Sequence, residues 1–258
     1  AMRDLNHSRS VRARRSGGFT LIELLVAMLL ALFLIGGLLT LEQSTRKSFG
    51  NQNQLVQLQD DERLAMTLMA EVIEASGYFP NPVANTLVGS FPATAPFTAA
   101  GQSVYGVSAA SAQGDTVTAR YVTANNDNII NCTGGTNTSG GNFLWINAFS
   151  VDANNNLICT LGNAAPVGLV SGVTNMSILY GVKTNFAVTN TSADSYLTAA
   201  QVTATNNWIN VVSVQVTLTF TNPLYGGGPG STTYNTGQPP TVSFSRVICV
   251  MAKGGVNS

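Results

Sequence analysis

The chain has 258 residues, of which 45% are apolar and only 9% carry a charge at neutral pH. Soluble domains usually carry about one charged residue in four, so uncharged polar residues such as Asn, Thr and Ser fill the difference here. Twelve basic and twelve acidic side chains balance each other, which argues against nucleic-acid binding as the main function.

Residues 1–18 form a basic stretch with five arginines, one aspartate and the chain's single histidine, His7. Residues 19–41 follow as an apolar segment whose one charged side chain is Glu23. As a helix this segment measures roughly 35 Å, enough to cross the hydrocarbon core of a bilayer. Arginines before a span predict a cytoplasmic N-terminus, so the rest of the chain is expected outside the cytoplasm.

Two ordinary explanations of this segment fit less well. A secretory signal should have its small residues after the apolar run, whereas here Gly17 and Gly18 precede it. A plain membrane anchor explains the length but not Glu23, because a carboxylate within a span is costly unless it has a partner. The position of Glu23 therefore indicates a function.

Residues 17–28 read Gly-Gly-Phe-Thr-Leu-Ile-Glu-Leu-Leu-Val-Ala-Met, and this run resembles the class III signal of type IV prepilins. The resemblance implies that a prepilin peptidase cuts between Gly18 and Phe19 and methylates the new N-terminal Phe19. It also implies that Glu23 pairs with the terminal amine of a neighbouring subunit, where each charge offsets the other's cost in lipid. Phe19 and Glu23 are thus the expected assembly pair.

Removal of the leader changes what the chain can do chemically. Seven basic and eleven acidic side chains would remain, a net charge of −4, and no histidine. This balance disfavours direct capture of DNA. It also excludes a Ser-His-Asp or Cys-His catalytic apparatus and a His-ligated metal, so we expect no enzyme, no cofactor and no metal site.

The sequence beyond the span predicts three further segments. Residues 42–76 lack proline and place apolar side chains at spacings of three and four, which predicts an amphipathic helix lying against a globular domain. Residues 77–112, rich in Pro, Ala, Ser, Thr and Gly, are expected to be a connecting loop. Residues 113–258 are expected to form an antiparallel β domain with long loops, its strands at 116–122, 143–151, 157–161, 176–182, 211–220 and 242–251.

Several of these segments resemble PilW-like minor pilins. The similarity lies in the helix end at 62–78, a Tyr-Gly strand at 173–182, an Asp-x-Tyr motif at 194–202 and a Trp at the start of 208–214. It implies an α+β, type IV pilin-like fold, in which a long N-terminal helix packs on an antiparallel β-sheet. The Pro- and Gly-rich loop at 223–240 departs from the family pattern.

Three cysteines fall in the part of the chain expected outside the cytoplasm, where thiols are oxidised. Cys132–Cys159 is the favoured disulfide because both residues flank a predicted hairpin around residues 152–156. Cys159–Cys249 remains an alternative. Cys249 lies in an apolar run and is expected to be a buried thiol.

These observations predict a minor pilin that takes part in priming the assembly of a type IV pilus, within a tip complex of minor pilins. The resemblance implies that its partners are other minor pilins, the major pilin, the prepilin peptidase and the inner-membrane assembly platform. The chain is expected in the inner membrane through residues 19–41, then at the cell surface, with no direct nucleic-acid partner. Alternatives are a minor pseudopilin of a type II secretion system, a tip adhesin and a DNA-uptake pilin.

Overall fold

The computed structural model describes residues 18–187, 192–226 and 238–250. Two units make up the chain, Ala1–Phe49 and Gly50–Ser258. Helix α1 (Leu21–Glu74) extends from the first unit into the second without interruption. The predicted leader, except for Gly18, lies outside the described residues, and so does most of the loop predicted at 223–240.

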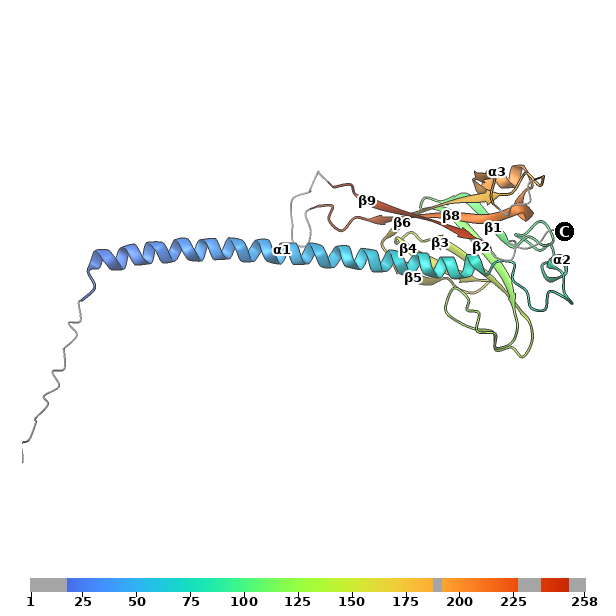
Figure 1. The fold of residues 1–258 in the computed structure, drawn as a ribbon, viewed down its shortest axis with the longest axis horizontal. Helices are drawn as coiled ribbons and strands as arrows, with labels where there is room; N and C mark the ends of the chain where they lie inside the picture. Colours follow the sequence, from blue (N-terminus) through green and yellow to red (C-terminus); the bar gives the residue numbers. More distant parts are fainter. Residues whose placement is uncertain (1–17, 188–191, 227–237, 251–258) are drawn as a thin grey trace, which may run out of the picture. The chain divides into compact units, whose positions relative to one another are not determined.

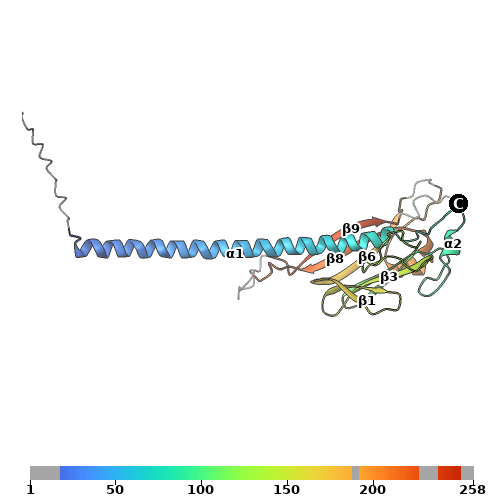
Figure 2. The same cartoon turned by 90° about the horizontal axis from the view of Figure 1, so that it is seen from below.

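The second unit combines the C-terminal part of α1 with one nine-stranded sheet (Figures 1 and 2). Two short helices, α2 (Leu87–Ser90) and α3 (Ala199–Ala204), and a 3-10 turn, η1 (Trp208–Asn210), lie in the connections. The strands are β1 (Val104–Ser111), β2 (Gly114–Thr123), β3 (Phe143–Val151), β4 (Asn156–Leu161), β5 (Val167–Ser171), β6 (Val173–Val182), β7 (Ser195–Leu197), β8 (Val211–Thr221) and β9 (Thr241–Cys249).

The strand order is β5-β4-β3-β2-β6-β8-β9, with β1 paired to β2 and β7 paired to β6. The sheet was predicted to be antiparallel, and its pairings are so except where β2 meets β6 in parallel at Gly114 and Met176. The exception follows from the chain path. β3, β4 and β5 each run antiparallel to the strand before them, so β5 runs opposite to β2. The chain reverses once more before β6, which therefore lies beside β2 in the same direction.

Backbone contacts and one carboxylate hold this parallel junction. Met176 N donates to Gln113 O at 3.0 Å, and Asp115 accepts from Ile178 N of β6 at 2.8 Å. The other oxygen of Asp115 accepts from Ala109 N of β1 at 2.7 Å. A side chain at Gly114 would place its Cβ 2.2 Å from Met176 O, so only glycine allows the two strands to approach this closely.

The core lies between one face of the sheet and the C-terminal part of α1, as the amphipathic pattern predicts. Ala65, Met69 and Ile73 of the helix are fully buried against the apolar side chains of β2, β6 and β8. Leu55 was expected on the same stripe but is 40% exposed. The continuous buried stripe therefore begins at Leu58, one turn further along the helix.

Helix α1 ends where the sequence predicts, at a glycine. Gly77 has a φ of +80°, the left-handed conformation that commonly follows a helix. Its N–H donates to Arg120 O at 2.9 Å, and Tyr78 O accepts from Val122 N at 2.8 Å. The end of the helix is thus fixed to the middle of β2.

The prediction that residues 77–112 form only a connection is wrong, because α2 and β1 lie within them. Strand β1 pairs with β2 and was missed because its apolar–polar alternation stops after Gly106, and its remaining residues are largely exposed. Strands β5 and β7 were also missed. Both are short, with five and three residues, and longer neighbours supply their hydrogen-bond partners.

Candidate functional site

The N-terminal signal residues lie at the start of α1. Phe19 is 83% exposed and precedes the helix. Thr20 caps the first turn, since its Oγ1 accepts from Glu23 N at 3.4 Å and its carbonyl from Leu24 N at 3.2 Å. Glu23 lies in the first turn of the helix and is exposed. The pairing expected for Glu23 requires a second subunit, and this structure holds a single chain.

The first part of α1 is long and apolar enough to cross a membrane. Its large apolar side chains between Leu21 and Leu41 are 51–79% exposed. Such a continuous apolar surface is unfavourable in water and needs lipid or other helices around it. The first part of α1 is therefore suited to membrane anchoring.

Cys132 and Cys159 form a disulfide with a Cα–Cα distance of 6.3 Å, the pairing favoured from the sequence. Both residues are buried, and Cys132 N donates to Asn147 Oδ1 at 3.0 Å. The bond ties the loop between β2 and β3 to β4. It excludes the alternative pairing of Cys159 with Cys249.

Cys249 is a free cysteine and is exposed, so its prediction as a buried thiol is wrong. Side chains on a strand alternate between the two faces. Ile248 and Val250 are buried, and Cys249 between them therefore points away from the core. The period of two was present in the sequence and could have placed this residue correctly.

Three of the four segments that resemble PilW-like proteins meet around β6, β7 and β8. The ring of Trp208 packs on Tyr180 at a centroid distance of 4.8 Å, and its Nε1 donates to Thr203 Oγ1 at 3.0 Å. Tyr196 pairs with Gly181, and a Cβ at Gly181 would lie 3.2 Å from the Tyr196 ring and 2.1 Å from Ser213 Oγ. The Tyr-Gly, Asp-x-Tyr and Trp motifs thus form one packing cluster.

Tyr180 lies in the centre of this cluster and is fully buried. Burial raises the pKa of Tyr180 well above its ordinary value, because the phenolate would lose its hydration. The hydroxyl stays protonated and donates to Thr116 O at 3.4 Å. Tyr180 therefore joins β6 to β2.

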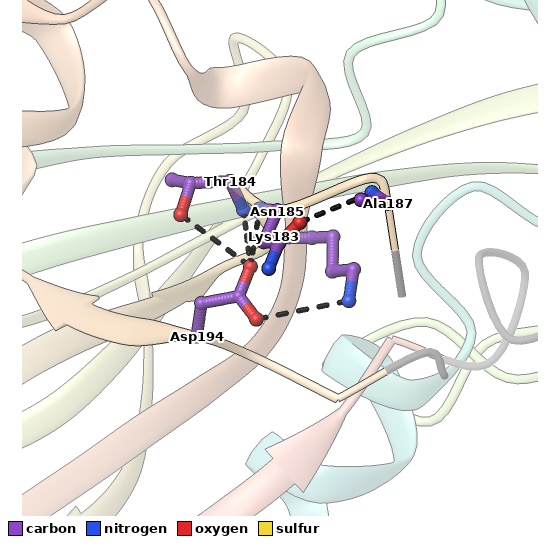
Figure 3. Close-up of polar contacts among 5 residues, drawn as sticks. All are labelled: Lys183, Thr184, Asn185, Ala187 and Asp194. Atoms are coloured by element: carbon purple, nitrogen blue, oxygen red, sulfur yellow. Dashed lines mark hydrogen bonds and ion pairs between the residues drawn. The ribbon is translucent and has the colours of Figure 1, made fainter. Parts of the chain in front are cut away.

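Asp194, from the Asp-x-Tyr motif, organises the loop that follows β6 (Figure 3). Its Oδ2 accepts from Thr184 N at 2.7 Å and Asn185 N at 2.6 Å, and Lys183 Nζ lies 3.7 Å from its Oδ1. The backbone N–H groups of Asn185 and Thr184 hold the pKa of Asp194 below its ordinary value, with a smaller contribution from Lys183. The carboxylate acts as a structural acceptor that closes the loop.

Arg120 is the one fully buried charged side chain among the residues that the structure describes, and no sequence pattern indicated its role. Its guanidinium donates to the carbonyls of Gln102 and Pro92 at 2.7 and 2.9 Å and lies 4.1 Å from the centroid of the Phe97 ring. Burial lowers the pKa of Arg120 to about 10, so it stays charged at neutral pH. Arg120 fixes the chain between α2 and β1 to β2.

Within residues 18–187, 192–226 and 238–250, no group of three or more His, Cys, Asp or Glu side chains could hold a metal ion. The polar side chains described above bind backbone groups of the chain itself. What the arrangement provides is an apolar anchor and a rigid sheet domain with exposed surfaces, which suits assembly with other proteins.

Comparison with known proteins shows which families and structures the chain resembles. The family model described as Type IV Pilus-assembly protein W matches residues 135–246, and the prokaryotic N-terminal methylation motif matches residues 13–39. A type IV-like pilin from Thermus thermophilus is 15% identical, with a TM-score of 0.41, over 77% of this chain and 97% of its own. No curated protein matches significantly.

The N-terminal methylation motif, the apolar helix and the disulfide in the sheet domain are features in which the chain resembles type IV pilin-like proteins. Residues 135–246 match the PilW family model. Both resemblances seen in the sequence are thereby confirmed, and so is the fold of a long helix packed on a β-sheet.

Proposed function

We propose that the chain is a minor pilin that takes part in priming type IV pilus assembly, within a tip complex of minor pilins. The observation that carries the proposal is the order of features along one chain: a match to the methylation motif at 13–39, the helix α1 (Leu21–Glu74), and a match to the PilW model at 135–246 within the sheet domain. A helix shared between an anchor and an assembly domain suits a subunit that leaves the membrane to join a filament.

The proposed sequence of events starts at the membrane. The chain inserts with its N-terminus in the cytoplasm, and the prepilin peptidase cuts between Gly18 and Phe19 and methylates Phe19. The exposed position of Phe19 ahead of the helix is compatible with this cut. The sheet domain then lies in the periplasm, an oxidising compartment that suits the Cys132–Cys159 disulfide.

Assembly follows from the charges at the new N-terminus. The Phe19 amine of one subunit pairs with Glu23 of a neighbour, because each charge is costly in lipid when alone. The partners are other minor pilins, the major pilin and the inner-membrane assembly platform. The sheet domains then form the small complex that starts the pilus.

A clean deletion strain tests the proposal. Surface pilin is measured by shearing, and protein secretion is measured in parallel. Loss of pili with normal secretion is the expected result. Normal pili with blocked secretion would instead identify a minor pseudopilin of a type II secretion system. Normal pili with lost attachment or DNA uptake would identify an adhesin or an uptake pilin.

A further inference from the structure

A pocket of about 630 Å³ lies at the C-terminal end of α1, within the sheet domain. The helix end contributes Glu71, Glu74, Ala75 and Tyr78 to it, and residues 128–130 form the opposite wall. Ala75, Tyr78, Ile129 and Ile130 give it an apolar lining. This volume suits a side chain or a short segment of another molecule.

Both walls of the pocket are fixed in place. Tyr121 donates its hydroxyl to Ile130 O at 2.6 Å, and Asp127 accepts from Ile129 N at 3.2 Å. The disulfide at Cys132 holds the same loop two residues further on. Because Tyr78 is bound to Val122 of β2 on the other side, the pocket is formed before any partner arrives.

The charges at the pocket are all of one sign. Glu71 and Glu74 lie one helical turn apart on its rim. The ion pairs among the described residues join Arg46 to Glu42 and Lys183 to Asp194, so neither rim glutamate has a basic partner in that part of the chain. A lysine or arginine at the rim would find two carboxylates there, and an acidic side chain would be repelled.

We propose that this pocket receives a segment of a neighbouring pilin-type subunit, which places an apolar side chain against Tyr78 and Ile129 and a lysine or arginine against Glu71 and Glu74. The inference rests on the proposed function, because assembly into a complex supplies the neighbour. It goes further because it assigns the surface of this chain that binds the neighbour. It also assigns the apolar and basic side chains that this surface recognises.

Photocrosslinking in the native bacterium tests this directly. A photoreactive phenylalanine analogue replaces Tyr78 in the full-length protein, and the crosslinked peptide is sequenced by mass spectrometry. We expect a segment of a pilin-type protein that contains a lysine or arginine beside an apolar residue. Glu71→Lys with Glu74→Lys should reduce the product by at least about fivefold. Asp60→Lys, an exposed acid on the same helix but outside the pocket, should leave it unchanged.

An exchange of charges between the pocket and its partner provides a second test. Changing the partner's basic residue to glutamate in the Glu71→Lys, Glu74→Lys background should restore the product. The amount of the double variant in membranes and its intact Cys132–Cys159 disulfide show that it folds. The variant with Glu71→Gln and Glu74→Gln serves as an uncharged comparison. A product that survives charge reversal, a segment without a basic residue, or no product would overturn the inference.

The deletion strain separates this inference from the proposed function. If the deletion strain keeps normal pili, the proposed function fails. If the deletion strain loses pili while the double charge-reversal variant restores them with an unchanged crosslink, only the pocket inference fails.

Discussion

The Asp194 carboxylate binds backbone N–H groups of the loop that it closes, and this lowers its pKa below the ordinary value of 3.8. Since the charged form is favoured in the folded state, its contribution to stability is present above that value and is lost as the pH falls through the lowered pKa. Asp194→Asn should therefore reduce the urea midpoint at pH 7, and the difference from the parent should shrink as the pH falls below 3.8 through the lowered pKa of Asp194.

The measurement is urea unfolding of the detergent-solubilised full chain across that pH range. Asp152, whose pKa is lowered mainly by its hydrogen bonds to Asn156, retains its own acid sensitivity in both proteins. Asp60→Asn on the exposed side of α1 serves as the control. A difference that does not shrink as the pH falls through the acid range below 3.8 would show that the lost carboxylate charge is not the cause.

Gly181 supports a second prediction about a single residue. A Cβ there would lie 2.1 Å from Ser213 Oγ and 2.8 Å from Ala193 Cβ, so Gly181→Ala must displace its neighbours. We expect a loss of about 1–3 kcal/mol in the free energy of unfolding, measured by urea denaturation. Gly168→Ala in β5 has no atom within 4 Å of the added methyl and should be nearly neutral. Equal stability of the two variants would contradict the crowding at Gly181.

At the scale of elements, the disulfide joins two residues 27 positions apart in sequence. Closing a loop of this length stabilises a domain by about 3 to 4 kcal/mol in the chain-entropy treatment. Cys132→Ser should lower the free energy of unfolding by about this amount and remove the effect of a reducing agent. Thermal or urea unfolding with and without dithiothreitol provides the measurement.

Cys249→Ser is the matched control for the disulfide, because Cys249 is exposed and free. It should leave stability unchanged within about 0.5 kcal/mol. A large loss on Cys249→Ser with none on Cys132→Ser would reverse the assignment of the bonded pair.

Elements with a strong internal pattern could be predicted from the sequence, and elements defined by their neighbours could not. Strand β8 alternates over eleven residues, and its predicted range differs from the observed one by a single residue. By contrast, the three residues of β7 are a strand only because β6 offers them partners. The parallel contact at Gly114 likewise depends on where distant strands return, which no local periodicity encodes.

The residues of the candidate site also fall into two groups: those that a local sequence pattern predicts and those that only the fold brings together. The signal at Gly18, Phe19 and Glu23 is a contiguous run and could be recognised directly. Arg120 could not, because it stands in a strand between Ala119 and Tyr121, and its carbonyl partners come from a loop 18 to 29 residues away. Glu71 and Glu74 belong to the segment 42–76 that the sequence predicts as an amphipathic helix, and only the fold brings Ile129 opposite them.

For the whole molecule, the predicted cut after Gly18 can be tested by mass. Gly18→Ala should hold the protein at the mass of its unprocessed form, because the peptidase requires glycine before the cut in the family that the signal resembles. Immunoblotting or intact mass spectrometry of membranes gives the result. Gly36→Ala, inside the anchor with no neighbour within 4 Å, should be processed normally. Normal processing of Gly18→Ala would refute the assigned cut.

The same N-terminus supports a prediction about incorporation. Glu23→Ala should leave cleavage intact and reduce the amount of this protein in sheared pili by roughly tenfold or more, since an unpaired terminal ammonium is costly in lipid. Glu42→Ala removes an acid that already pairs with Arg46 outside the apolar segment and should incorporate normally. Undiminished incorporation of Glu23→Ala would contradict the pairing.

The path of the chain through the sheet also sets the order in which its parts can fold. Strands β1 to β5 pair only with their sequence neighbours until β6 arrives, and both disulfide cysteines lie within this stretch. Short-range pairings form early, and chains emerge N-terminal end first. The cysteines can therefore meet and be oxidised while β8 and β9 are still being synthesised. Cys249 is the last cysteine to be synthesised. In this order of events, Cys132 and Cys159 have formed their disulfide before Cys249 emerges.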